Sequence, residues 1–227
     1  LCTMLTAGYA APEKELRNDV LAVTQLLLPV PEFCEAAADA GTFTALLAVG
    51  TCPELGSRPE LVQAFALSTD VVDLELRLLS WSCLALGCSL PSVLGQALSA
   101  GLLPALLLYV KPPEGHLAVR RWNPDCFATL RSAALSRLHT IAPACFPEYD
   151  AAGGVATLVE FLATCGVPSH TEAALRHVHR LLVAAPGAKE AFGAAGLVSV
   201  LIERLAEGRA AWTRCWRASS RCAAWTR

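Results

Sequence analysis

Three histidines and a nearby cysteine form the densest group of potential metal ligands in this sequence. They are His170, His177, His179 and Cys165. His170 and His177 are seven residues apart and would share a face if one helix covered both, whereas His177 and His179 point to different faces. The Pro168-Ser169 pair is expected to break the segment before the helix begins. Zinc sites use close Cys/His pairs at defined spacing, which this chain lacks, so we predict no metal and no cofactor, and expect surface or partly buried imidazoles.

The chain contains none of the common motifs of nucleophilic or nucleotide-dependent enzymes. The sequence contains no GxSxG elbow, no P-loop and no GxGxxG after a strand. His139 lies between Cys126 and Cys145 in sequence, but on an apolar helix such residues more often pack in a core. We therefore predict a protein that is not an enzyme. An enzyme with no recognisable motif stays open as an alternative.

A Leu-Arg pair occurs four times, and each copy precedes an Ala-Gly pair by 24, 24, 22 and 20 residues. The Leu-Arg pairs are Leu16-Arg17, Leu76-Arg77, Leu130-Arg131 and Leu175-Arg176, and the Ala-Gly pairs are Ala40-Gly41, Ala100-Gly101, Ala152-Gly153 and Ala195-Gly196. Guanidinium groups bind carboxylates bidentately. If the units stack in register, the four arginines would line one surface and bind acidic protein segments. The alternative is that each arginine pairs with an acid of its own unit or caps a helix.

The elements that would position these arginines are helices. Leu16, Val20, Val23 and Leu27 form one apolar helical stripe. A short helix over 32–39 then leads to the Ala40-Gly41 corner, where glycine supplies a left-handed or tightly packed backbone, and a further helix covers 42–49. The same order recurs at 70–87, 91–99 and 102–110, then at 125–141, 144–149 and 155–165, and then at 171–184, 187–194 and 197–206.

Corner-to-corner spacing is 60, 52 and 43 residues, and the longer units carry extra residues in the linkers 51–59 and 111–124. After each corner an apolar pair returns at a fixed offset. These pairs are Leu46-Leu47, Leu106-Leu107, Leu158-Val159 and Leu201-Ile202. A recurring unit of this length predicts a solenoid, which offers a surface for holding partners. Trp122, in the second long linker, is a candidate anchor for a partner.

A long helix, a short helix, an Ala-Gly turn and a closing helix in about 42 residues resemble an armadillo repeat. The stretch 189–202, KEAFGAAGLVSVLI, is the best single match, and the resemblance covers roughly residues 12–207. It implies an all-α fold, a right-handed solenoid of about four repeats, although HEAT-type pairing is also possible. The array is assigned to 1–208 and an Arg/Trp-rich tail to 209–227, which is either a binding segment, a capping helix or a gene-model artefact.

Armadillo proteins that grip extended peptides carry an asparagine late in the long helix. The matching positions here are about Leu26, Leu86, Thr140 and Ala185, and none is asparagine. A narrower resemblance, carried by the opening APEKELRNDVL at 11–21 and by Trp122-Asn123-Pro124-Asp125, is to cilia- and flagella-associated armadillo proteins of the axonemal central apparatus. It implies a structural scaffold of the motile cilium axoneme with axonemal or microtubule-associated protein partners.

Composition limits the remaining choices. The chain is 54% hydrophobic and 17% charged, so we expect neighbouring protein to cover some of its apolar surface. A net charge of −2 argues against nucleic acid as a partner. Ten scattered cysteines without a CxxC motif favour an intracellular location, in the cytoplasm or cytoskeleton. Because the chain opens on Leu1, we expect a piece of a longer protein, with neighbouring repeats of that chain among its partners.

One segment could be interpreted as a membrane span. Residues 78–110 include no formally charged side chain over 33 positions, which is long enough to cross a bilayer. Pro91, Gln96 and Pro104 interrupt it, and it contains one of the four corners. We therefore predict buried solenoid core and no membrane contact, with a membrane-associated protein as the alternative.

Overall fold

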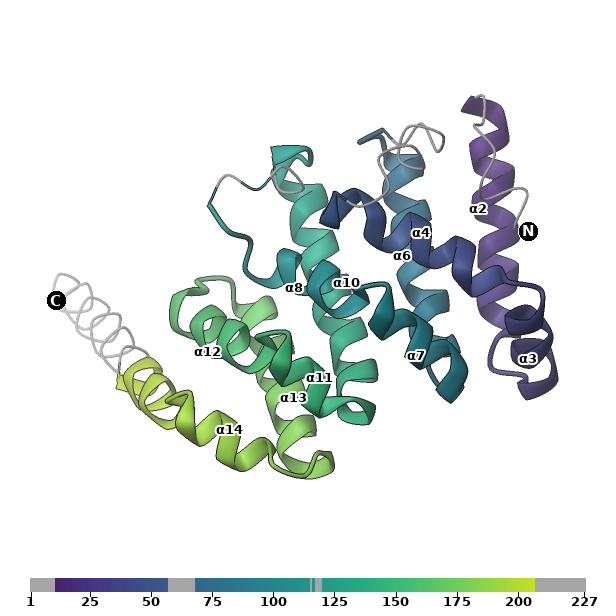
Figure 1. Ribbon diagram of the computed structural model, residues 1–227. Helices are drawn as coiled ribbons and strands as arrows, with labels where there is room; N and C mark the ends of the chain where they lie inside the picture. The colour runs from purple at the N-terminus through teal and green to yellow at the C-terminus, as the bar shows by residue number, and fades with distance from the viewer. Residues whose placement is uncertain (1–10, 57–67, 115, 117–119, 207–227) are drawn as a thin grey trace, which may run out of the picture.

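The computed structural model describes residues 11–56, 68–114, 116 and 120–206, and regular structure in this part of the chain is helical, without strands (Figure 1). The C-terminal tail assigned to 209–227 lies outside the described residues. The helices are α2 (Ala11–Leu27), α3 (Pro31–Asp39), α4 (Thr42–Leu55), α6 (Val71–Gly87), α7 (Pro91–Ser99), α8 (Leu102–Val110), α10 (Pro124–Ile141), the 3₁₀ turn η1 (Ala142–Ala144), α11 (Phe146–Ala151), α12 (Gly154–Thr164), α13 (Pro168–Ala184) and α14 (Ala188–Ala194). Residues 197–206 form one further helix.

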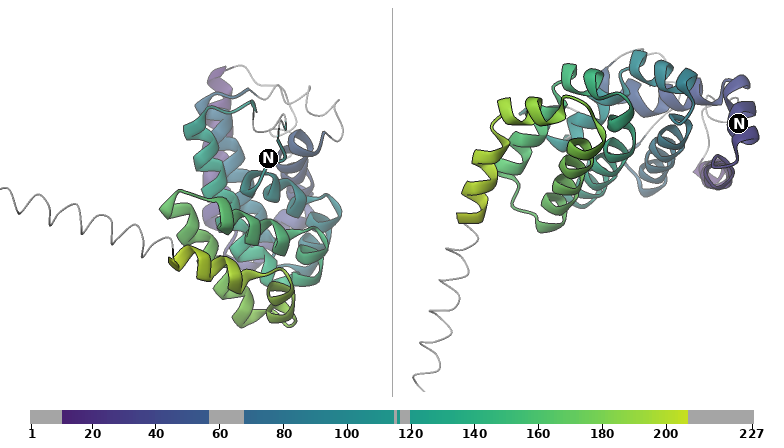
Figure 2. Two further views of the ribbon diagram at one scale, coloured as in Figure 1. Left: turned by 90° about the vertical axis from the view of Figure 1, so that its left-hand side faces the viewer. Right: turned by 90° about the horizontal axis from the view of Figure 1, so that it is seen from below.

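One three-helix order repeats along the chain. Each long helix (α2, α6, α10, α13) is followed by a short helix (α3, α7, α11, α14), a corner, and a third helix (α4, α8, α12, 197–206). The long helices stand side by side, each in contact with the next (Figure 1). The array is elongated and curved, with α2 at one end and the helix of residues 197–206 at the other (Figure 2). The predicted fold, an all-α armadillo-like right-handed solenoid, is confirmed.

Capping side chains and prolines explain where several of the helices begin. Asp70 and Asn123 cap α6 and α10 through side-chain oxygens that accept backbone N–H groups three residues on. Proline occupies the first turn of α3, α7, α10 and α13, where a missing N–H costs no helical hydrogen bond. Pro168 therefore begins α13, although the Pro168-Ser169 pair was expected to break the segment before its helix. As a result, His170 and His177 lie on one helix.

The four Ala-Gly corners share one conformation. Gly41, Gly101, Gly153 and Gly196 have φ of 73°, 78°, 80° and 80°, in the left-handed region that glycine adopts without a steric penalty. At each corner the glycine N–H donates to the carbonyl three residues earlier, at 2.8–3.1 Å, and the alanine N–H to the carbonyl four residues earlier. The predicted repeat corners are thereby confirmed as equivalent turns.

The core is one continuous apolar spine along the array. The first three apolar pairs after the corners are buried in it, as are Trp81, Tyr109 and Tyr149. Trp81 fixes its ring by donating from Nε1 to the Gly50 carbonyl at 3.0 Å. The third helix of the first unit also runs further than predicted, to Leu55, with Pro53 in its last turn.

In the outermost long helix, α2, the predicted apolar stripe lies on the exposed side and not on the buried side. Its predicted apolar stripe, with Leu16 at 56% exposure, faces away from α6. The side of α2 that meets α6 instead carries Lys14, Arg17, Asn18 and Leu21. The stripe is exposed because α2 has a neighbouring long helix on one side only among the described residues.

The uncharged segment 78–110 runs through parts of α6, α7 and α8. Across the described ranges, no single helix has the length and apolar character of a membrane span, although α7 and α8 taken together pass that test with a bend of 65° between them. Both helices bury residues in the spine, including Val93, Ala97, Leu102 and Leu106. The segment therefore contributes to the core of the array, as predicted.

Candidate protein-binding surface

The Leu-Arg arginines were expected to line one surface, and the structure places each in a different environment. Arg17 is buried between α2 and α6, where its Nη2 lies 2.9 Å from Asp73 Oδ1. Lys14 Nζ lies 2.6 Å from Asp73 Oδ2. Burial alone would raise the pKa of Asp73, but hydrogen bonds from Lys14, Ser68 and Arg17 outweigh it and hold the pKa below its ordinary value. Arg17 thus joins two repeats.

Arg77 is also buried, at the joint of three elements. Its Nη1 forms an ion pair with Glu54 at the end of α4, and Tyr109 of α8 donates to the same carboxylate oxygen at 2.8 Å. Burial lowers the pKa of Arg77 from its ordinary value. The buried charges are therefore paired with each other and are not presented to a partner.

Arg131 is half-buried in the joint of α8, α10 and α12. Its Nε donates to the Tyr109 carbonyl at 3.1 Å, and its guanidinium carbon lies 4.7 Å from the centre of the Phe127 ring and 5.5 Å from that of Phe161. Stacking of this kind holds a guanidinium by cation–π attraction. Arg131 therefore also serves the packing between repeats.

Arg176 is the member of the set that is fully at the surface. Its Nη2 lies 2.6 Å from Glu172 Oε1 one turn earlier on α13, and both side chains are exposed. The expected continuous arginine row is thus wrong as geometry: Arg17 and Arg77 are enclosed, Arg131 is half-enclosed, and Arg176 is exposed and paired with Glu172 of its own helix. The exposure of each arginine depends on the position of its helix in the array, because only α13 lacks a following long helix among the described residues.

Trp122, the predicted loop anchor, is buried rather than presented. It lines a cavity of about 10 Å³ with Glu54, Arg77 and Tyr109. This volume is about that of one water-sized probe. The ring therefore packs the linker onto the buried ion pair.

The histidines do not converge on a metal. His170 Nε2 lies 3.0 Å from Ser132 Oγ, and His177 Nε2 lies 3.3 Å from the Tyr149 hydroxyl, which itself donates to the Gly154 carbonyl. His179 is exposed. Groups of three or more His, Cys, Asp or Glu side chains placed to hold an ion are absent from the described residues. Burial lowers the pKa of His177 to about 3, with the nearby His139 and Arg180 adding to the effect.

An exposed groove of about 780 Å³ runs along α13 and the adjoining edge of α10. We call it the α10–α13 groove; it is lined by His139, Glu172, Leu175, Arg176, His179, Arg180, Val183 and Ala184. Val183 is 74% exposed, and Arg180 has no ion-pair partner among the described residues. The lining thus combines apolar side chains with two arginines and one carboxylate, Glu172, which pairs with Arg176. The apolar side chains and Arg180 suit an amphipathic segment bearing carboxylates.

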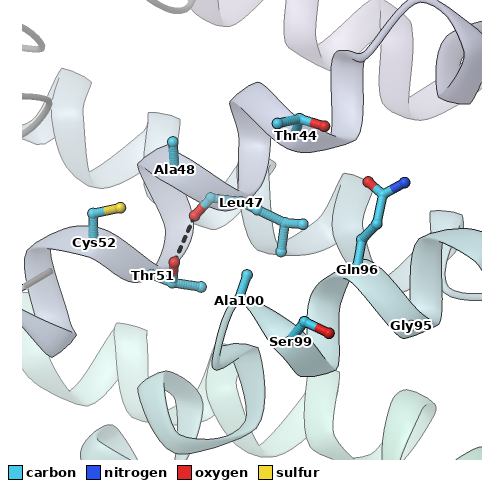
Figure 3. A pocket seen from close by; sticks show the side chains of 9 residues that line it. All are labelled: Thr44, Leu47, Ala48, Thr51, Cys52, Gly95, Gln96, Ser99 and Ala100. Atoms are coloured by element: carbon cyan, nitrogen blue, oxygen red, sulfur yellow. Dashed lines mark hydrogen bonds between the residues drawn. The ribbon is translucent and has the colours of Figure 1, made fainter. Parts of the chain in front are cut away.

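A second groove, of about 650 Å³, lies between α4 and α7 (Figure 3). Its lining is small and uncharged, with Thr44, Gln96 and Ser99 around Leu47 and Ala100. The Thr51 hydroxyl is taken up by its own helix, donating to the Leu47 carbonyl at 2.8 Å. This groove therefore offers few directed polar groups to a partner.

Comparison with known proteins identifies the family of the chain. The family model described as "Cilia- and flagella-associated protein 69, ARM repeat" matches residues 1–181. The chain belongs to this armadillo-repeat family. The mouse cilia- and flagella-associated protein 69 is 26% identical over 163 residues, which is 72% of this chain and 17% of the mouse protein. The human protein of that name is 31% identical over 160 residues, 70% of this chain and 16% of the human protein.

The chain therefore corresponds to about one-sixth of the length of these family members. Among solved structures, the crystal structure of an engineered protein superimposes with a TM-score of 0.55 at 17% identity, covering 89% of this chain and 70% of that one. That likeness concerns the fold alone. Family membership and fold agree on an armadillo-type repeat array.

The groove contains residues that sequence reasoning did not single out. Arg180 and Val183 follow Arg176 at helical spacing on the exposed side of α13. Their signal is a stripe of cationic and apolar side chains on a long helix that is followed by no further long helix in the part of the chain that the structure describes. Asp73 and Glu54, which neutralise Arg17 and Arg77, were missed because they lie in neighbouring elements.

Proposed function

We propose that the chain is part of a non-catalytic scaffold of the motile cilium, holding axonemal or microtubule-associated proteins along its array. Membership of the cilia- and flagella-associated protein 69 family supports the ciliary association. The stacked helices supply a stiff support, because each repeat shares its core with its neighbours. Sites on such a support bind without a large ordering cost.

The α10–α13 groove is the proposed partner-binding site. The observation that carries this proposal is that Arg176, Arg180, Leu175 and Val183 are exposed together on one face of α13. An amphipathic protein segment would bury its apolar side chains against Leu175 and Val183 and present carboxylates to the two arginines. Arg17, Arg77, Arg131 and Trp122 support this site from within the array by holding the repeats in register.

The test is capture of partners from an extract of ciliated cells, with the tagged chain as bait. We expect axonemal proteins to be retained by the native chain and lost with Arg176→Glu/Arg180→Glu. The matched control is Lys189→Glu, which reverses an exposed charge on α14 outside the groove. Equal retention by all three proteins would remove the groove from the proposal. A tagged parent protein that does not enter cilia would overturn the ciliary role itself.

A further inference from the structure

A small cavity lies where the linker before α10 packs onto the first two units. Its volume is about 10 Å³, close to the smallest space that holds a water molecule. Its polar lining consists of Glu54, Ser68, Arg77, Tyr109, Arg121 and Trp122. These residues belong to α4, the segment before α6, α6 itself, α8 and the linker before α10. The lining is thus assembled from separate repeats.

One buried oxygen in this lining has no partner. Glu54 is 3% exposed, and both of its protein contacts are made by Oε1, which pairs with Arg77 and accepts from the Tyr109 hydroxyl at 2.8 Å. Glu54 Oε2 is also buried, and no hydrogen-bond donor reaches it from the described residues. A buried carboxylate oxygen without a donor is costly, because it has lost the water that it bound in the unfolded chain. Glu54 Oε2 therefore requires a donor, and the cavity that Glu54 lines is where one can lie.

The other side chains of the lining do not supply this donor. The Ser68 hydroxyl donates to Asp73 Oδ2 at 2.7 Å, and the Tyr109 hydroxyl is used by Glu54 Oε1. Arg121 lines the cavity, but within the described ranges no hydrogen bond or ion pair joins it to Glu54. The donor must therefore come from a molecule bound in the cavity.

Size and charge restrict what this molecule can be. A space of one probe sphere admits a single non-hydrogen atom with its hydrogens. A metal cation would meet the positive charges of Arg77 and Arg121, and an anion would meet the carboxylate of Glu54. Burial lowers the pKa of Arg77 and the charge of Arg121 adds to the effect, so both cations act on this space. A neutral molecule that donates and accepts hydrogen bonds fits both charges, and water is such a molecule of this size.

We propose that the cavity is a binding site for one water molecule, which donates to Glu54 Oε2 and accepts a hydrogen bond from Arg121. Its second hydrogen can reach the Ser68 oxygen, which donates its own hydrogen to Asp73 and keeps lone pairs free to accept. Three hydrogen bonds are typical of a buried water molecule. The site shares no residue with the α10–α13 groove, so it does not depend on the proposed function.

The bound water gives the linker a second attachment to the joint of the first two units. Trp122 provides the first attachment, because its ring is buried against the Glu54–Arg77 pair. Arg121 is exposed, and the water lets its guanidinium act on Glu54 without being buried itself. Arg120 is exposed as well but does not line the cavity, so only one of the two adjacent arginines has this role.

A crystal structure of the native chain tests the site directly. We expect one ordered water molecule about 2.7 Å from Glu54 Oε2 and within hydrogen-bond distance of Arg121. Three outcomes would overturn the proposal: a direct ion pair between Arg121 and Glu54 Oε2, a cavity without an ordered molecule, or an ion with the shorter contacts of a coordinated metal.

Paired arginine variants test the role of the water in solution. Arg121→Met removes the donor to the water and should raise the unfolding equilibrium constant about tenfold, as measured in urea. The matched control is Arg120→Met, which should change this constant less than about twofold. In the Glu54→Leu/Arg77→Met background, which lacks the acceptor, Arg121→Met should have no further effect. Equal losses in the two arginine variants, or an undiminished loss in that background, would refute the link from Arg121 to Glu54.

Discussion

Buried charge in this protein lies at the joints between repeats. Arg17 of α2 meets Asp73 of α6, and Arg77 of α6 meets Glu54 of α4. Such pairs add little net stability, because desolvation offsets their attraction, but an unpaired member is costly. A helix displaced by one residue would leave a charge buried alone. We therefore attribute to these pairs the selection of one register between neighbouring repeats.

Among the Leu-Arg arginines, Arg77 is buried in an ion pair and Arg176 forms an exposed one, so substitutions at the two positions can be compared directly. Arg77→Met should lower the free energy of unfolding by about 3–5 kcal/mol, because Glu54 would remain buried without its cation. Arg176→Met removes an exposed pair and should change it by less than about 0.5 kcal/mol. Urea unfolding measures both. Similar losses for the two variants would contradict the assigned environments, and Glu54→Gln/Arg77→Met should recover part of the larger loss.

His177 predicts a loss of stability in acid. The unfolded imidazole takes up a proton near pH 6.5, whereas burial holds the native pKa at about 3. As pH falls below 6.5 the unfolded state binds a proton that the native state does not, so stability falls by about 1.4 kcal/mol per pH unit from this group until about pH 3. His139 and His170, whose pKa values burial also lowers, add to the slope.

Urea unfolding at pH values from about 7 to about 4 checks this prediction. His177→Phe keeps a ring beside Tyr149 and should reduce the slope, since Tyr149 still donates to the Gly154 carbonyl. His179→Gln, on the exposed side of the same helix, should leave the slope as it is. An unchanged slope in His177→Phe would show that His177 titrates normally in the native state.

At the scale of the elements, the corners set the geometry of each unit. A left-handed glycine ends the short helix and serves as the N-cap residue of the third helix within one turn. Three of the four corner glycines, Gly41, Gly153 and Gly196, have open space where a side chain would point. Backbone conformation alone therefore requires glycine at these three positions. At Gly101 an added Cβ would also meet Leu55 Cδ1 at 2.7 Å.

Two glycine-to-alanine substitutions isolate the effect of backbone conformation, because a Cβ would meet no neighbouring atom at either position. Gly41→Ala should lower the free energy of unfolding by about 1 kcal/mol, because φ is 73° and no neighbouring atom interferes. Gly95→Ala, in the exposed interior of α7 and equally unobstructed, should raise it by about 0.5–1 kcal/mol. Thermal unfolding of the two variants measures the difference. A shift of the same sign in both would refute the role given to the corner.

The sequence was informative where structure depends on near neighbours. Ala-Gly pairs and apolar periodicity predicted the helices, the corners and the repeat. The partners of the arginines could not be predicted, because Asp73 is 56 residues from Arg17 and Glu54 is 23 residues from Arg77. The stripe of Leu16 and Val23 was visible, but whether it is covered depends on a neighbouring helix and not on α2 itself.

At the scale of the whole molecule, stability depends on position in the array. Interior helices have a neighbour on both sides, whereas α2 and 197–206 are each covered on one side among the described residues. Stability in solenoids is a sum of repeat and nearest-neighbour contributions, so helices with one neighbour open at a lower free energy. The helices α2 and 197–206 are therefore the least stable parts of the described array.

Hydrogen exchange of the native chain tests this gradient. Amides of α6, α8 and α10 should exchange most slowly and those of α2 and 197–206 fastest, because opening an end breaks one interface and opening the interior breaks two. Uniform exchange along the array would contradict the gradient.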